Sequence, residues 1–261
     1  AGGIFFSFSL RNTLLNQQKL YVLEVAERAS KDFTDHITRE MLTLEGISKI
    51  FADFYVYSSL DEYLQILDDV SNHYAFNQTG LFFNNTKTAY FENGEIINDF
   101  LPQEVVNKVL EGQSVVSNLI LDPFTKQPII IYATPFIVNG RTEAILFATQ
   151  SLPGLHKTLD KYKVSGEGFI VVLNKKDQVI IDTEDNSPFD PQDLKQLLSL
   201  NGKEGLILYE NLLSVLDQED TGVLNYIIEK TKEQRLISFV KISVLGLEDW
   251  HLIFVLPSSV I

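Results

Sequence analysis

The longest continuous pattern in the sequence runs from about Leu10 to Tyr57 and contains no proline and a single glycine, Gly46. Apolar residues recur along it mostly in steps of three and four, the spacing of one helical face. At 1.5 Å per residue, a helix of this length spans roughly 70 Å, more than the diameter of a small domain. We therefore predict one long amphipathic helix that lies along more than one folded unit and forms a homodimer contact near its N-terminal half. The apolar positions are Leu15, Val22, Val25, Ala29, Phe33, Ile37, Met41, Leu44, Ile47, Phe51 and Phe54.

A second helix is predicted to begin just after Ser59, because Ser59 and Glu62 have the spacing of a capping box, in which each side chain binds the other residue's free amide. The residues expected on its buried side are Leu60, Leu64, Leu67 and Val70.

Beyond this helix the chain repeats one plan twice: two strands, a helical stretch, then three strands. The first pass has predicted strands at Gly80–Phe83, Thr88–Phe91, Ser114–Leu121, Pro128–Val138 and Ala144–Ser151, a helical stretch at Pro102–Leu110 and a tight turn at Asn139-Gly140. The second pass has predicted strands at Gly168–Leu173, Val179–Thr183, Gly222–Glu229, Arg235–Val244 and Trp250–Leu256, and a helical stretch at about Pro191–Leu200. A short helix at Leu152–Tyr162 is expected to join the two passes.

This order predicts an α+β fold in which a long N-terminal helix precedes two tandem modules, each a five-stranded antiparallel sheet flanked by helices. The predicted boundaries are 1–57 for the helix, 58–155 for the first module and 156–261 for the second.

Composition excludes several classes of function. The chain has 21 basic and 35 acidic residues and a formal net charge of −14, which argues against a nucleic-acid partner because phosphate backbones require a supply of Lys and Arg. The acidity is concentrated in the two modules, whereas the long helix is nearly neutral. There is no cysteine, which rules out thiolate catalysis, disulfides and Cys-based metal sites and fits an extracytoplasmic bacterial protein.

No catalytic or metal-binding set is apparent in the sequence. The four histidines, His36, His73, His156 and His251, are far apart and form no HExxH spacing, and there is no phosphate-binding loop or nucleophile elbow. An acidic cluster of Asp182, Glu184, Asp185 and Asp190 lacks the glycine and terminal Glu of an EF-hand. We therefore expect no enzyme, no metal and no cofactor in this chain, and a binding function instead.

Three stretches resemble the double Cache family of tandem PAS-like extracytoplasmic sensor domains in bacterial membrane receptors. The first is similar to the family's strand–turn–strand core, the second to its membrane-proximal strand pair and the third to its Trp-anchored final strand. They are Leu121–Phe147, Gly168–Asp182 and Asp249–Pro257, and together with the long helix they are distributed over almost the whole length of the chain.

The resemblance implies a ligand-sensing domain on the extracytoplasmic side of the bacterial cell membrane. Ile4–Leu10 would then continue from one membrane helix and Pro257–Ile261 would lead into a second, with an output such as a diguanylate cyclase, histidine kinase or chemoreceptor module outside this chain. The alternative is a structural or adhesive surface module that binds no small molecule.

The resemblance also places a ligand pocket in the first, membrane-distal module. Relatives that bind amino acids carry an Arg-x-Trp-Tyr motif and a late Asp, whereas this chain has neither Arg nor Trp in 99–106 and has Ala148-Thr149-Gln150 where the Asp is expected. Without those charges, and with acidic modules, a neutral or cationic ligand is favoured. The residues expected to line the pocket are Tyr90, Asp122, Phe124, Tyr132, Thr134, Phe147 and Thr149.

Overall fold

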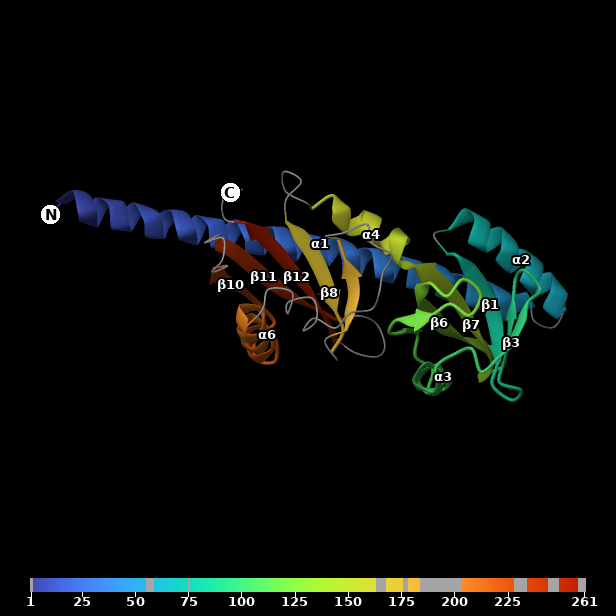
Figure 1. Cartoon of the computed structure of the whole chain (residues 1–261). Coiled ribbons are helices and arrows are strands. Elements are labelled where there is room, and N and C mark those ends of the chain that lie inside the picture. Colours follow the sequence, from blue (N-terminus) through green and yellow to red (C-terminus); the bar gives the residue numbers. More distant parts are fainter. Residues whose placement is uncertain are drawn as a thin grey trace. The chain divides into compact units, whose positions relative to one another are not determined.

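Two antiparallel β-sheets, each in its own compact unit, carry the fold (Figure 1). The computed structural model describes residues 2–54, 59–74, 76–162, 168–175, 178–183, 203–227, 234–243 and 249–257. We call Thr34–Leu155 the first unit, and Ala1–Phe33 together with His156–Ser243 and Asp249–Ile261 the second unit.

The long helix is α1, Gly2–Phe54, and it contributes residues to both units. Its buried stripe follows the predicted spacing, although Phe54, which we expected on that stripe, is exposed. The helix is divided at Phe33 and Thr34 between the two units, so it does not form a compact part of its own. The fully buried apolar side chains of the stripe are Val22, Ala26, Ala29, Phe33, Ile37, Met41, Leu44 and Phe51.

The first unit contains a seven-stranded antiparallel sheet of order β3-β2-β1-β7-β6-β4, with β5 also paired to β6. Five strands were expected here. One extra strand is β3, which continues the sheet beyond β2, and the other comes from the division of the predicted strand Ser114–Leu121 into two. The strands are β1 Gln78–Phe83, β2 Thr88–Phe91, β3 Ile96–Asn98, β4 Val115–Val116, β5 Ile120–Leu121, β6 Pro128–Val138 and β7 Arg141–Ser151.

Ser117 explains the division between β4 and β5. Its backbone N–H donates to the Ile131 carbonyl at 2.8 Å, but the returning bond, from the Ile131 N–H, goes to the Ser117 side-chain oxygen at 2.8 Å. A side chain thus replaces the backbone as acceptor and the regular ladder is interrupted, as in a β-bulge.

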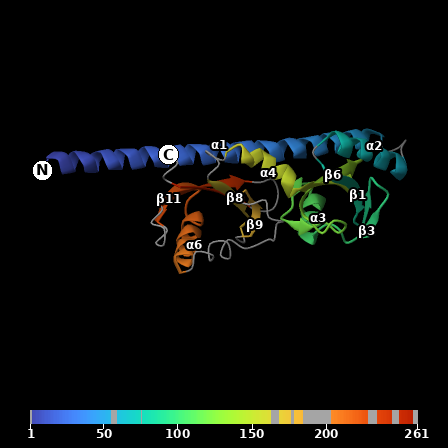
Figure 2. The ribbon, with the colours of Figure 1, turned by 45° about the horizontal axis from the view of Figure 1, so that its top comes forward.

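Helices cover both faces of this sheet (Figure 2). The C-terminal half of α1 and α2, Leu60–His73, lie on one side, which we call the α1 face, and α3, Gln103–Leu110, lies on the other, the α3 face. The predicted capping box begins α2, since Ser59 and Glu62 exchange side-chain-to-backbone bonds. The Tyr63 hydroxyl then donates to the carbonyl of Phe51, which ties α2 to α1.

The second unit contains a five-stranded antiparallel sheet of order β10-β11-β12-β8-β9. Trp250 is fully buried and its ring centroid lies 6.3 Å from that of Phe33 on α1, while the Ser238 hydroxyl donates to the Val22 carbonyl of the same helix. The strands are β8 Phe169–Leu173, β9 Val179–Asp182, β10 Thr221–Ile227, β11 Gln234–Ser243 and β12 Asp249–Pro257.

Two further helices complete the described chain. The predicted joining helix is confirmed as α4, Leu152–Asp160. Helix α6, Lys203–Leu216, packs Leu212 and Leu216 on the second sheet, and the sequence patterns we used did not predict it. The helical stretch that we predicted at about 191–200 lies outside the described residues. No helix in the described ranges is both long enough and apolar enough to cross a membrane.

Candidate functional site

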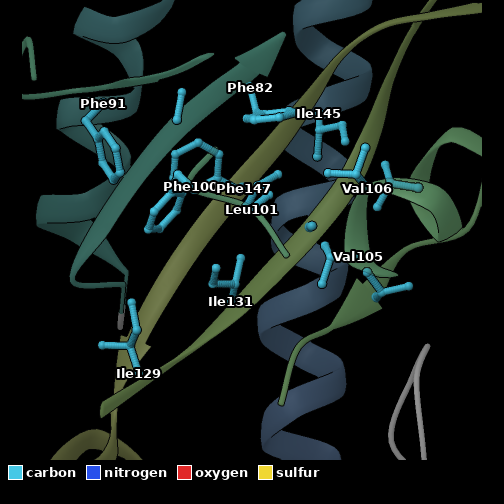
Figure 3. Packing of buried hydrophobic residues seen from close by; sticks show 14 residues of the cluster. Phe82, Phe91, Phe100, Leu101, Val105, Val106, Ile129, Ile131, Ile145 and Phe147 are labelled. Carbon is cyan, nitrogen blue, oxygen red and sulfur yellow. The ribbon is translucent and has the colours of Figure 1, made fainter. Parts of the chain in front are cut away.

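The α3 face of the first sheet carries a cluster of buried aromatic and aliphatic side chains (Figure 3). Three phenylalanines form its centre: the ring centroid of Phe91 lies 5.0 Å from that of Phe100 and 5.1 Å from that of Phe147, and the last two are 5.2 Å apart. These spacings are typical of aromatic rings in contact. Helix α3 closes the cluster with Val105, Val106 and Val109.

Gly80 makes room for this cluster on β1. It lies directly opposite Phe147 of β7, and a Cβ atom at Gly80 would meet the Phe147 ring at 2.5 Å and the Tyr90 carbonyl oxygen at 2.4 Å. The Phe147 ring therefore occupies the space that a side chain at Gly80 would need. In the second unit, Gly222 and Phe239 form the same kind of cross-strand pair, with a Cβ-to-ring distance of 2.5 Å.

Buried polar side chains lie next to the phenylalanine cluster, further along strands β1 and β7 and in the segment between β4 and β5. The side-chain oxygens Gln78 Oε1, Thr149 Oγ1 and Asn118 Oδ1 are buried, and none has a hydrogen-bond partner among the described residues. Gln78 is directly opposite Thr149. Side chains an even number of residues apart on one strand lie on the same face, so Gln78 lies on the α3 face with Phe82, and Thr149 lies there with Phe147. Asn118 is close in the fold to this pair. It follows Ser117, which is hydrogen-bonded to Ile131, and Ile131 of β6 is the residue paired with Thr149 of β7.

A polar network connects the opposite, α1 face of the sheet to the long helix. The Tyr132 hydroxyl donates to Gln150 Oε1 at 2.7 Å, and Gln150 Nε2 lies 3.1 Å from His36 Nε2. Burial, and then the nearby Glu40, raise the pKa of Tyr132, so its hydroxyl keeps the proton that it donates. Since Gln150 Nε2 can only donate, His36 accepts this bond at Nε2. The other ring nitrogen, Nδ1, lies 3.4 Å from Arg39 Nη2 and 3.9 Å from Glu40 Oε1.

Burial lowers the pKa of His36 below its usual value of 6.5, with Glu40 opposing this shift and Arg39 adding to it. The folded chain therefore binds this proton less readily than the unfolded chain, and stability falls as the pH drops below about 6.5. We expect the unfolding free energy of the wild type, measured in urea, to fall relative to that of His36→Gln as the pH is lowered from 7.5 to 5, because only the wild type has this histidine. The difference between the two proteins should change by at most about 1.4 kcal/mol per pH unit. A difference that is constant with pH would contradict this assignment.

The seven residues predicted from sequence to line one pocket lie on both faces of the sheet. Phe124, Phe147 and Thr149 lie on the α3 face, where Phe124 packs against Phe91 with centroids 5.2 Å apart. Tyr132 and Thr134 lie on the α1 face, as does Tyr90 by alternation with Phe91. The two sets cannot contact one ligand, because the sheet separates them.

Asp122, the remaining predicted residue, is buried in the turn between β5 and β6. Its Oδ1 accepts the backbone N–H groups of Phe124 at 2.7 Å and Thr125 at 3.2 Å. This is an Asx turn, in which the carboxylate holds the backbone. Of the polar atoms that lack partners, sequence reasoning identified Thr149 and missed Gln78 and Asn118, whose burial is not encoded in any local pattern.

No group of three or more His, Asp or Glu side chains within the described part of the chain is arranged to hold a metal ion. Of the acidic cluster noted in the sequence, Glu184, Asp185 and Asp190 lie outside the described residues. The four histidines do not converge: His36 belongs to the polar network, and the His73 ring bonds the Asp69 carbonyl on its own helix.

Comparison with known proteins identifies the architecture. No protein-family model and no curated protein matches the sequence. Solved structures do match: the ligand-binding domain of the Pseudomonas aeruginosa PAO1 amino acid chemoreceptor PctB, in complex with L-Arg, has a TM-score of 0.69 at 13% identity and covers 94% of this chain and 97% of its own. The chain has the double Cache fold.

Other structures with this double Cache fold are similar over nearly their full lengths. The sensory domain of the Campylobacter jejuni chemoreceptor Tlp3, with isoleucine bound, has a TM-score of 0.71 at 14% identity and covers 95% of this chain and 96% of its own. The ligand-binding domain of the P. aeruginosa chemoreceptor PctC, in complex with GABA, has a TM-score of 0.66 at 12% identity and covers 92% and 100%. These neighbours are ligand-binding domains rather than enzymes.

Proposed function

We propose that this double Cache chain is the extracytoplasmic ligand-sensing domain of a bacterial transmembrane receptor, and that it binds a small molecule on the α3 face of the first unit. The observation that carries the proposal is a set of three buried oxygens that have no hydrogen-bond partner in the described part of the chain, Gln78 Oε1, Asn118 Oδ1 and Thr149 Oγ1. A buried polar atom without a hydrogen bond costs about 1–3 kcal/mol, and a ligand that supplies the missing bond recovers this energy. The double Cache fold, shared with chemoreceptor domains that bind L-Arg, isoleucine and GABA, supports the same function.

The three oxygens also indicate what kind of ligand fits. Amide oxygens only accept hydrogen bonds, and a hydroxyl both accepts and donates, so the site favours a molecule rich in N–H or O–H donors. The segment 99–106 offers no arginine to bind a carboxylate. We therefore propose a neutral or cationic ligand with an apolar part that contacts the phenylalanine cluster.

Binding is proposed to shift the balance between two conformations of the receptor, which requires that the ligand bind one of them more tightly. Helix α1 contributes residues to both units, as does the shorter helix α4. Because α1 is the longer of the two, it is the proposed route for the signal, with the two chain ends leading to the membrane. Leu14, Leu20 and Tyr21 are exposed near its N-terminal half, which supports the homodimer contact proposed for this part of the helix.

Thermal denaturation with a panel of amines, amides, amino acids and polyols tests the proposal. A ligand present at about ten times its Kd adds about 1.4 kcal/mol to stability and raises the Tm by a few degrees. For any probe that does so, Thr149→Val should weaken binding at least tenfold, because it removes the hydroxyl but keeps the side-chain volume.

Thr142→Val, on the same strand but outside the α3 face cluster, is the matched control and should leave binding unchanged. If no probe raises the Tm, the proposed ligand-sensing function is contradicted. That result would favour the alternative, a structural or adhesive module in which the α3 face is only a packed core. If both valine variants weaken a binder equally, the placement on the α3 face is wrong.

A further inference from the structure

A pocket of about 280 Å³ lies along the β6 edge of the first sheet, beside the C-terminal half of α1. Its walls come from the C-terminal half of α1, the segment between α3 and β4, and the end of β6. This volume is just below the range of about 300–1,000 Å³ that is typical of small-molecule sites, which suits a ligand of only a few heavy atoms. The polar residues that line it are Glu45, Ser48, Lys49, Ser114 and Thr134.

A chain of hydroxyl groups fixes the carboxylate of Glu45 in this pocket. Ser114 Oγ donates to Glu45 Oε1 at 2.5 Å, and it lies 2.9 Å from Thr134 Oγ1. Since Ser114 has a single proton and gives it to Glu45, Thr134 must donate to Ser114. Thr134 is 3% exposed, so these hydroxyl groups run from a buried part of the pocket wall to the Glu45 carboxylate. Glu45 Oε2 receives no hydrogen bond from any described residue.

The backbone carbonyl at the strand edge in the pocket wall already has a hydrogen-bond partner, so it is not the group that would bind a ligand. The Pro135 carbonyl accepts the Ser48 hydroxyl at 2.8 Å, and proline has no N–H to offer. β4 pairs with β6 only as far as Ala133, so without Ser48 this carbonyl would be an open edge group. The charged groups that line the pocket are the Glu45 carboxylate, whose Oε2 is not hydrogen-bonded to a described residue, and the ammonium of Lys49.

Lys49 follows Glu45 by one helical turn and lines the same pocket. Residues at this spacing have Cβ atoms about 5–6 Å apart and commonly form an ion pair. Among the described residues no ion pair joins them, and Lys49 has no other partner. A fixed negative group and an unpaired positive group thus border one small cavity whose remaining walls, including Pro135, are largely uncharged.

We propose that this pocket binds a small zwitterion, with the ligand's ammonium group at Glu45 and its carboxylate at Lys49. The site is separate from the proposed ligand site, because none of the residues that line it belongs to the phenylalanine cluster or carries one of the three buried oxygens. Each charge of the ligand meets the opposite charge of the protein, whereas a ligand with one charge meets one attractive and one repulsive group.

Isothermal titration calorimetry with three probes of one carbon skeleton tests the proposal: β-alanine carries both charges, propylamine only the ammonium and propionate only the carboxylate. We expect saturable binding of β-alanine at millimolar concentrations and at least tenfold weaker binding of the other two. Glu45→Gln, which can still accept the Ser114 bond, and Lys49→Gln should each weaken β-alanine binding at least tenfold.

Glu27→Gln and Lys31→Gln are the matched controls, because these exposed residues have the same spacing on the same helix but do not line the pocket. They should leave the β-alanine affinity unchanged. The proposal is overturned if β-alanine does not bind, or if propylamine binds as tightly and Lys49→Gln has no effect. It is also overturned if Thr149→Val, and not Glu45→Gln, abolishes β-alanine binding, a result that would instead support the α3-face site.

Discussion

Phe147→Ala is expected to lower the free energy of unfolding of the first unit by about 3–5 kcal/mol, the cost of deleting a buried aromatic ring that leaves a cavity. Phe147 is fully buried and its ring centroid lies within 5.2 Å of those of Phe91 and Phe100. The ring also covers Gly80, so its loss exposes the backbone of β1 to a void. Urea denaturation followed by far-ultraviolet circular dichroism measures the change.

Phe124→Ala is the control for this prediction. Phe124 contacts the same cluster through Phe91 but is only partly buried at its border, so its removal should cost clearly less. Equal losses for the two variants would mean that the three central phenylalanines do not form the tightly packed part of the cluster. Phe147→Leu, which keeps most of the apolar volume, should recover part of the lost stability.

Trp250→Ala is the second large effect that we expect, a loss of about 3–5 kcal/mol in the second unit. Trp250 is 1% exposed, and together with Phe33 it joins strand β12 to the long helix. Because this is the only tryptophan, the unfolding of the variant must be followed by circular dichroism, whereas in the wild type its fluorescence reports on this unit.

Phe33→Ala provides a partner test. Since Trp250 and Phe33 contact each other, the double variant should lose less stability than the sum of the two single losses, with a coupling energy of about 0.5–3 kcal/mol. Strictly additive losses would show that Trp250 stabilises the sheet without holding α1, contrary to our interpretation. Trp250→Phe, which preserves a ring, should be the mildest of these changes.

The elements that the sequence predicted well are those with a strong local signal. The stripe along α1 repeats over many turns, and the capping box at Ser59 and Glu62 marks the beginning of α2 to the residue. The strands β6 and β7 are joined by Asn139-Gly140, both of which adopt the positive φ that a tight hairpin turn requires. Each of these signals depends on neighbouring residues alone.

The candidate site was predicted less well, because it depends on which face of a sheet each residue occupies and on what covers that face. Tyr132 and Thr149 lie close together on two paired strands, but their side chains lie on opposite faces of the sheet, and only that of Thr149 is on the face of the phenylalanine cluster. His36 has no distinctive sequence context, yet in the structure it meets Gln150, more than a hundred residues later. Such pairs are selected by packing and not by spacing.

The sequence by itself determined the long helix, the doubled strand plan and the absence of thiol chemistry, since periodicity, turn residues and composition act locally or over the whole chain. Only the tertiary structure decided that Ser117 divides a strand, that Gly80 accommodates the Phe147 ring, and that Glu45 and Lys49 border one pocket. These features arise where elements distant in sequence come within a few ångströms of each other, and whether a polar atom there finds a partner depends on which groups the fold brings to it.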